Sequence, residues 1–171
     1  MPLDSGLTSF PPFGDGLRGV QGGVHDREGA LWVFTDGAVY SGSHGEGGWV
    51  LEDASGTLLG VDASVYPDVQ DPFLVELLAL RDGIQWALEM GVQDVVFAGD
   101  AKVVLDKVKE DLFLDARGGA ILSEIKVLRQ CFLQSSVRFV GRARNRVTHM
   151  VARKALSLFP SLIGFDFRSC L

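Results

Sequence analysis

The stretch that most constrains the fold is Leu31-Trp-Val-Phe-Thr-Asp-Gly-Ala38, a short apolar run that ends in an acidic residue and a glycine. Four consecutive apolar residues predict a strand that is buried on both faces, as in the centre of a sheet with helices on each side. Asp36 then lies at the end of a central strand, where a carboxylate is costly to desolvate. From this stretch alone two interpretations are open. Asp36 either forms a turn with Gly37 or awaits a metal ion.

Length and composition predict one globular domain. The chain has 171 residues, of which 47% are apolar, and this suffices for a single core. No run approaches the roughly 18 apolar residues that a membrane helix needs, and the N-terminus lacks the pattern of a signal peptide. Cys131 and Cys170 lack metal-type spacing, and Cys131 lies in an apolar helical pattern that predicts a core position. We expect a soluble intracellular monomer with no membrane contact and no small-molecule cofactor, in the nucleus or the cytoplasm.

The charges are distributed unequally along the chain. Residues 1–100 contain 3 Lys and Arg against 16 Asp and Glu, whereas residues 101–171 contain 13 against 6. An acidic half that holds metal and a basic half that contacts phosphate would be consistent with a nucleic-acid partner. The alternative is that the two halves interleave in the fold and their fields largely cancel.

Apolar periodicity predicts an α/β order between two tails. Residues 1–28, rich in Gly, Pro, Asp and Ser, predict a flexible arm, and residues 161–171 form an apolar C-terminal tail. Three antiparallel strands come first, because a turn signal at 54–56 separates two strand-like runs. The remaining expected elements are a helix over 73–90 closed by Gly91, a strand over 94–100, helices over 101–108 and 116–133, a strand over 137–140 and a helix over 145–158. The expected order is β-β-β-α-β-α-α-β-α.

Two further acidic residues stand at informative positions. Glu76 shares a helix face with Phe73 and Leu80, so its carboxylate is placed where burial is expected, and buried Glu is rare without a partner. Asp100 ends a second apolar run, Asp94-Val-Val-Phe-Ala-Gly-Asp100, just before a helix. Each also has an ordinary interpretation. Glu76 can lie at the solvent edge of an offset apolar stripe, and Asp100 can be the N-cap of the following helix.

Five motifs follow one another along the chain: Thr35-Asp-Gly-Ala38, the Gly-rich stretch to Gly48, Val75-Glu-Leu-Leu-Ala-Leu-Arg-Asp-Gly83, Gly99-Asp-Ala-Lys-Val-Val104 and Asn145-Arg-Val-Thr-His149. Together they resemble the ribonuclease H-like domain of plant proteins and retroelement polyproteins, over residues 29–160. The resemblance implies a ribonuclease H-like α/β fold. Its mixed five-stranded sheet, with three antiparallel strands and then two further strands, would be flanked by helices.

The resemblance also implies an activity, namely a divalent-metal-dependent endonuclease that hydrolyses the RNA strand of RNA–DNA hybrids. Asp36, Glu76 and Asp100 would hold two Mg²⁺ ions, or Mn²⁺, with Asp36 shared between them. A metal ion would then be the partner that a buried Glu76 lacks. Gly47 and Gly48 would let the backbone approach a ribose 2′-OH, the group that distinguishes RNA from DNA.

The chain departs from the family pattern at three places. The family's fourth acid corresponds to His149, which we count among the catalytic residues together with Asp36, Glu76 and Asp100, although an imidazole binds Mg²⁺ poorly. The alternative is that His149 is simply a hydrogen-bonded residue near the core edge. The histidine-bearing loop corresponds to Gly141-Arg-Ala-Arg144, and we expect Arg142, Arg144, Asn145 and Arg146 to contact nucleic acid. The basic protrusion of bacterial enzymes is absent. Two alternatives to the nuclease are therefore a catalytically weakened nucleic-acid-binding module and a retroelement-derived protein-interaction domain, the latter suggested by the apolar tail.

Overall fold

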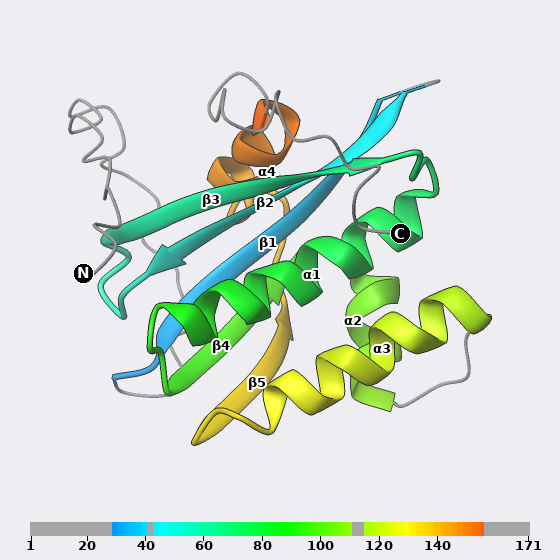
Figure 1. Ribbon diagram of the computed structural model, residues 1–171. Helices are drawn as coiled ribbons and strands as arrows, with labels where there is room; N and C mark the ends of the chain where they lie inside the picture. Colours follow the sequence, from blue (N-terminus) through cyan, green and yellow to red (C-terminus); the bar gives the residue numbers. More distant parts are fainter. Residues whose placement is uncertain (1–28, 41–42, 111–114, 156–171) are drawn as a thin grey trace, which may run out of the picture.

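The computed structural model describes residues 29–40, 43–110 and 115–155, so the predicted arm and apolar tail lie outside the described residues. These residues form one five-stranded sheet with strand order β3-β2-β1-β4-β5 and four helices (Figure 1). The predicted order of elements and the mixed α/β fold are confirmed. The elements are β1 (Leu31–Val39), β2 (His44–Glu52), β3 (Leu58–Pro67), α1 (Pro72–Glu89), β4 (Asp94–Gly99), α2 (Lys102–Glu110), α3 (Ala116–Arg129), β5 (Gln134–Phe139) and α4 (Arg146–Arg153).

β1 lies at the centre of the sheet, as its continuous apolar sequence predicts. It pairs antiparallel with β2 and parallel with β4, and β4 pairs parallel with β5. Successive side chains of a strand point to opposite faces, so Val33 enters one core while Trp32 and Phe34 enter the other. The ladder between β1 and β4 ends where Phe34 is opposite Ala98. Asp36 and Asp100 follow two residues beyond this last pair.

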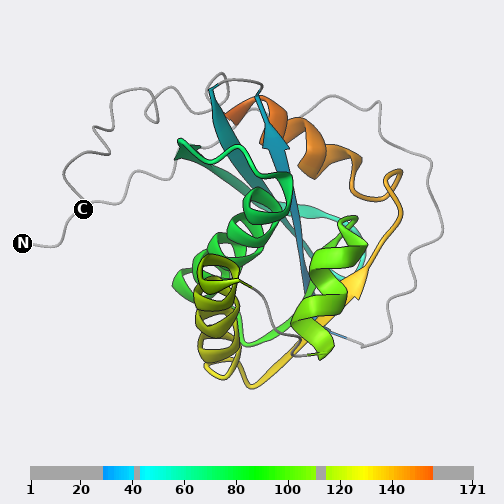
Figure 2. The same cartoon turned by 90° about the vertical axis from the view of Figure 1, so that its right-hand side faces the viewer.

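The helices cover the two faces of the sheet unequally. Helices α1, α2 and α3 lie on one face and α4 lies on the other (Figures 1 and 2). The larger core, under α1 to α3, includes Leu77, Ile84 and Phe97, whereas the smaller core, under α4, includes Val50 and Val151. Among the described residues, no helix combines the length and apolar character that crossing a membrane requires.

Helix α1 has clear signals at both ends. The Asp71 carboxylate accepts hydrogen bonds from the backbone N–H groups of Phe73 and Leu74, and Pro72 stands in the first turn, where its missing N–H costs nothing. Gly91 has a φ of 75°, which ends the helix as predicted. These ends set the bounds of α1, and Glu76 lies near its N-terminal end.

Several boundaries and one burial prediction differ from the sequence interpretation. α3 ends at Arg129 instead of 133, and β5 begins at Gln134 instead of 137. The predicted core position of Cys131 is wrong, because this residue lies in the turn after α3 and is exposed. The helical period misled here because Phe132, one residue later, is buried against Phe97 although it is no longer in the helix. The Gly-rich stretch before 48 forms β2 from His44 onward.

Candidate metal centre

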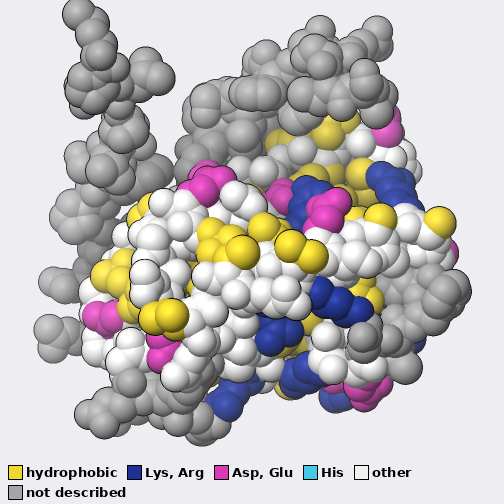
Figure 3. Space-filling model, turned by 60° about the horizontal axis from the view of Figure 1, so that its bottom comes forward, with side chains coloured by type: hydrophobic (Ala, Val, Ile, Leu, Met, Phe, Trp, Pro, Cys, Tyr) yellow, Lys and Arg dark blue, Asp and Glu magenta, His cyan; other side chains and the backbone are white. Residues whose placement is uncertain are grey.

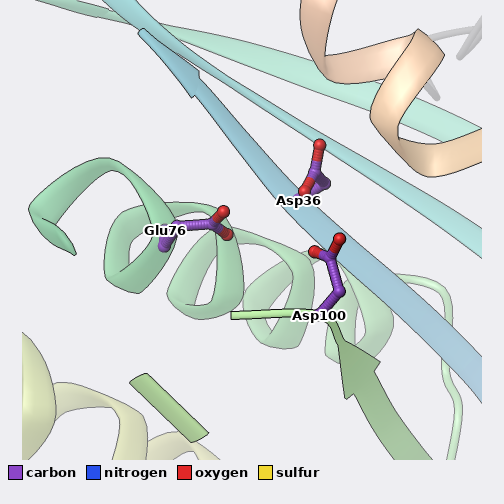
Figure 4. Close-up of side chains that lie close together, drawn as sticks. All are labelled: Asp36, Glu76 and Asp100. Carbon is purple, nitrogen blue, oxygen red and sulfur yellow. The ribbon is translucent and has the colours of Figure 1, made fainter. Parts of the chain in front are cut away.

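Three carboxylates from three elements meet at one end of the sheet. Asp36 comes from β1, Glu76 from α1, and Asp100 from the residue after β4. One carboxylate oxygen of each lies within 4.8 Å of those of the other two. Figure 4 shows the three side chains side by side, although their residues are far apart in the sequence. The structure therefore brings together the three residues that the motifs single out.

The Asp-Gly pair of the first motif is part of a strand. Asp36 and Gly37 lie within β1 and pair with Gly48 and Gly47 of β2, so the turn interpretation is wrong. A Cβ atom at Gly37 would lie 2.9 Å from the backbone nitrogen of Glu76, so glycine is what allows α1 to approach the strand this closely. The Gly37 N–H also donates to Glu76 Oε2 over 3.0 Å. Glu76 is thereby directed into the cluster rather than to the solvent edge.

The electrostatics of the cluster favour binding of a cation. Burial raises the pKa of Asp36 from 3.8 to about 7, and the neighbouring charge of Asp100 adds to the rise. Burial also raises the pKa of Glu76, to about 8, with further contributions from Asp36 and Asp100. A divalent cation would relieve both the desolvation and the mutual repulsion. Carboxylate oxygens are hard ligands, so the donor set fits Mg²⁺ or Mn²⁺.

Asp100 belongs to this cluster rather than to the start of α2. Its Oδ1 accepts a hydrogen bond from Asn145 Nδ2 over 3.2 Å, and its Oδ2 lies 3.9 Å from Arg142 Nε. α2 begins two residues later, at Lys102. Within the part of the chain that the structure describes, the helix-capping interpretation therefore has no hydrogen bond to support it.

His149 reaches the cluster from the opposite face of the sheet. It lies on α4, and its Nδ1 is 2.7 Å from Asp36 Oδ2. About half of the imidazole remains exposed. This residue corresponds to the family's fourth acid, and the structure brings it into direct contact with a candidate ligand. A hydrogen-bonded residue at the core edge and a part in catalysis are both compatible with this contact, so the catalytic role of His149 stays a prediction.

The expected nucleic-acid contacts around α4 fall into different environments. Arg142 has 96% of its side chain exposed, and Arg146 is exposed as well. Arg144 is held by the protein, because its guanidinium is 2.5 Å from Glu52 and lies over the ring of Phe34 at 4.2 Å from the centroid. Asn145 is fully buried. Arg142 and Arg146 are therefore the most exposed of these four residues, although Arg142 also lies 3.9 Å from Asp100 Oδ2. Contact of these residues with nucleic acid stays a prediction.

Gly47 and Gly48 lie inside the sheet. A Cβ atom at Gly47 would lie 2.5 Å from the hydroxyl oxygen of Tyr66, and one at Gly48 would lie 2.5 Å from the backbone nitrogen of Ala152. Close packing against a tyrosine on one face and α4 on the other accounts for both glycines. Their contact with a ribose stays a prediction.

The sequence interpretation missed a second polar network, which anchors the far end of α4. Glu46 on β2 is buried, its Oε1 is 2.8 Å from His44 Nε2, and its Oε2 accepts the N–H of Ala155 over 3.2 Å. The Tyr40 hydroxyl donates to the carbonyl of Arg153. The available sequence signal was an acidic residue between glycines on a strand. These contacts hold α4, and with it His149, against the β1–β2 hairpin.

The distribution of basic side chains bears on the charge asymmetry of the sequence. On the face shown in Figure 3, Lys and Arg side chains gather near the middle. The described part of the basic half includes Arg138 on β5 and the exposed Arg142 and Arg146. In this view some Asp and Glu side chains lie directly beside Lys and Arg side chains, so interleaving of the two halves stays open.

Comparisons with known proteins agree with this architecture. Residues 34–155 match a family model described as reverse transcriptase-like. RNase H1 from the halophilic archaeon Halobacterium salinarum is 21% identical and superposes with a TM-score of 0.69, covering 75% of this chain and 98% of that one. The N-terminal RNase H domain of a Mycobacterium tuberculosis protein gives 17% identity and a TM-score of 0.68, over 80% of this chain and 100% of that one.

A third similar structure contains nucleic acid. It is a compost-derived RNase H1 in complex with an RNA/DNA hybrid, with 12% identity, a TM-score of 0.67, and coverage of 75% of this chain and 97% of that one. No curated protein sequence matches this chain significantly. At these identities the solved structures establish a shared fold. With most of its length matched by the family model, the chain belongs to the reverse transcriptase-like family.

Proposed function

We propose that this protein is a divalent-metal-dependent endonuclease that hydrolyses the RNA strand of RNA–DNA hybrids. The observation that carries the proposal is the approach of the Asp36, Glu76 and Asp100 carboxylates to within 4.8 Å of one another. The likeness in fold to RNase H1 proteins, one of them solved with an RNA/DNA hybrid, supports the choice of substrate. The plant, retroelement-type subgroup, the monomeric state and the intracellular location stay predictions.

Each residue of the cluster has a distinct task in this proposal. When bound, two Mg²⁺ ions, or Mn²⁺, would supply an activated water and stabilise the leaving 3′ oxygen. Asp36 would be the shared ligand, and Glu76 and Asp100 would each hold one ion. Gly37 keeps the Glu76 carboxylate in place through its N–H. Arg142, which lies beside Asp100, and the exposed Arg146 at the start of α4 would bind phosphates of the substrate.

A specific observation favours a second candidate, a nucleic-acid-binding module with weakened catalysis. His149 already occupies one oxygen of Asp36, which the proposed metal ions would need. The third alternative, a protein-interaction domain, depends on the apolar tail, which lies outside the described residues. Binding without cleavage is what separates the module from the nuclease.

Cleavage assays on matched duplexes test the proposed function. We expect the full chain to cut the labelled RNA strand of an RNA–DNA hybrid in Mg²⁺ or Mn²⁺ and to lose this activity in EDTA. Double-stranded RNA and double-stranded DNA of the same sequence serve as comparison substrates. Binding of the hybrid with no cleavage in either metal would favour the non-catalytic module.

His149 gives a prediction about metal preference. Each carboxylate missing from a two-metal site raises the cost of holding both cations, and manganese tolerates nitrogen ligands better than magnesium does. We expect slow hydrolysis in Mg²⁺ and faster hydrolysis in Mn²⁺. His149→Asp should raise the Mg²⁺-supported rate by about tenfold, which corresponds to about 1.4 kcal/mol of activation free energy.

The matched control for this change is His149→Asn, which has nearly the same size as the aspartate variant but carries no charge. It should remain slow in Mg²⁺, because it adds a neutral amide oxygen in place of a carboxylate. Initial rates of hybrid cleavage in each metal decide the matter. A His149→Asp protein no faster than the parent in Mg²⁺ would show that His149 does not limit this site.

The three arginines around α4 give a prediction about binding. Each phosphate contact contributes about 0.9 to the slope of log affinity against log salt. Changing both Arg142 and Arg146 to Ala should therefore weaken hybrid binding and reduce the slope by about two. Fluorescence anisotropy over a salt series, without metal, measures both quantities.

Arg144→Ala is the control for these variants, because Arg144 is engaged with Glu52 and Phe34. It should keep the salt slope of the parent and instead lose stability, by about 1 to 2 kcal/mol from a partly buried ion pair and cation–π contact. If Arg144→Ala reduced the slope as much as Arg142→Ala, the division of roles would be wrong. If the triple change to Ala left affinity and slope untouched, none of the three would contact phosphate.

A further inference from the structure

Asn145 stands at a position where its residue type normally has another use. It is the N-cap residue of α4, and asparagine is among the preferred N-caps because its side chain can accept a hydrogen bond from the first turn. Here the side chain makes no capping hydrogen bond. It is instead fully buried and turned towards the sheet. The helix thus forgoes a common stabilising contact. The amide nitrogen is engaged elsewhere, whereas Oδ1 has no hydrogen-bond partner among the described residues.

The amide of Asn145 joins the ends of two strands. Its Nδ2 donates to the carbonyl oxygen of Thr35 over 3.1 Å and to Asp100 Oδ1 over 3.2 Å. The paired ladder between β1 and β4 stops just before these residues, at Phe34 and Ala98. Beyond this last pair, the side chain of Asn145 links the two strands in place of a backbone hydrogen bond. It bridges the backbone beside Asp36 to the carboxylate of Asp100.

The chemistry of this bridge suits a carboxylate that has to remain available to a cation. An amide donates a hydrogen bond without neutralising the charge of Asp100, whereas a lysine at this place would compete with a metal ion. One oxygen of Asp100 is fixed by the amide, and the other remains near Arg142 at 3.9 Å. The carboxylate is thus held in one orientation before any ion arrives.

We propose that Asn145 is a positioning residue of the acidic cluster, which sets its affinity for divalent cations by orienting the Asp100 carboxylate between β1 and β4. This inference rests on the proposed function and replaces the direct nucleic-acid contact expected for Asn145 from the sequence. Hydrogen-bond partners of metal ligands typically change metal affinity by about 10- to 100-fold when they are removed. The same range is expected here.

The test is isothermal titration calorimetry of Mg²⁺ and Mn²⁺ into the full chain, without nucleic acid. Asn145→Leu keeps nearly the same side-chain shape and removes both donors, and Asn145→Ala removes them together with the volume. Both should raise the metal dissociation constant by about 10- to 100-fold. Val151→Ala is the control, because Val151 is a buried α4 residue of the smaller core. It should lower thermal stability and leave the metal dissociation constant within about twofold of the parent value.

Three results would overturn the inference. The first is a metal affinity of Asn145→Leu equal to that of the parent. The second is an equal loss of metal affinity in Val151→Ala, which would show that the effect comes from a general loss of stability. The third is weaker hybrid binding by Asn145→Leu without metal, at unchanged metal affinity, which would restore the nucleic-acid contact. A parent protein that binds neither cation would instead refute the metal site itself, and with it the proposed function.

A measurement on the unmodified chain covers the case in which the variants do not fold. The side-chain amide signals of Asn145 in a ¹H–¹⁵N NMR spectrum should shift during a Mg²⁺ titration, because Asp100 Oδ1 is one of their acceptors. Signals that stay fixed while those of the Gly37 N–H move would show that Asn145 is not coupled to the cluster.

Discussion

Asp36→Asn is expected to abolish hydrolysis of the RNA strand, with a loss of at least about 1000-fold in rate, or about 4 kcal/mol of activation free energy. Asp36 is 2% exposed and lies between the other two carboxylates and His149. The amide has almost the same shape as the carboxylate, so the fold is kept while the ligand proposed for both cations loses its charge. Single-turnover cleavage of a labelled hybrid in Mg²⁺ and in Mn²⁺ measures the loss.

The matched control is Asp82→Asn, which changes a partly buried aspartate outside the cluster. Asp82 lies on α1, accepts a hydrogen bond from the Tyr66 hydroxyl over 3.0 Å and pairs with Arg81. It does not belong to the acidic cluster. The control should lose some stability and keep a cleavage rate within about fivefold of that of the parent. This corresponds to a change of under about 1 kcal/mol in activation free energy. Activity of Asp36→Asn close to that of the control would refute the assignment of Asp36 as the shared ligand.

The metal-free protein should become less stable as the pH rises from about 4 to about 8. The pKa values of Asp36, about 7, and Glu76, about 8, lie above the ordinary values of 3.8 and 4.5 that the unfolded chain would show. The folded state therefore holds these protons to higher pH, and their release costs folding free energy across this interval. Each tenfold change in an acid constant is worth about 1.4 kcal/mol, so the loss amounts to several kcal/mol.

Thermal unfolding in EDTA at about pH 5 and about pH 9 tests this, with an expected decrease in Tm on the order of 10 °C. Mg²⁺ at the higher pH should restore much of the loss, because a ligand that binds the folded state alone stabilises it. Glu76→Gln removes one of the two groups and should flatten the pH dependence. A parent protein as stable at high pH without metal as at low pH would show that the cluster carries no such electrostatic cost.

Much of the fold was predictable because apolar patterns report burial directly. The runs before Asp36 and Asp100 predicted two inner strands, and those strands are β1 and β4 at the middle of the sheet. The period of the stretch after Pro72 predicted α1, whose capping residue Asp71 and terminating residue Gly91 set its ends. Where the period continued past a helix end, as at Cys131, the prediction was wrong. A periodic pattern does not show where the backbone leaves the helix.

The site was predictable only in its acidic residues. Motif order placed Asp36, Glu76 and Asp100 on elements that could converge, and their oxygens do meet. The surroundings of Arg144 and Asn145 were not predictable, because each residue contacts a partner about 100 positions away. The position of Asn145 also depends on where the pairing of β1 with β4 ends. Arg144 contacts Glu52, 92 positions earlier, and Asn145 contacts Thr35, 110 positions earlier. No local pattern records such pairs.

In residues 29–155, as far as the structure describes them, α4 is the one helix on its face of the sheet, and this has a consequence for synthesis of the chain. A ribosome releases the three carboxylates first, whereas His149 comes 113 positions after Asp36. Until α4 emerges, Phe34 and Val50 have no helix to cover them, and the carboxylates have neither the imidazole nor the Asn145 amide beside them. The centre is therefore the last part of the domain to be completed. A chain stopped before α4 has three crowded carboxyl groups at the end of the sheet, without the contacts that α4 and Asn145 supply.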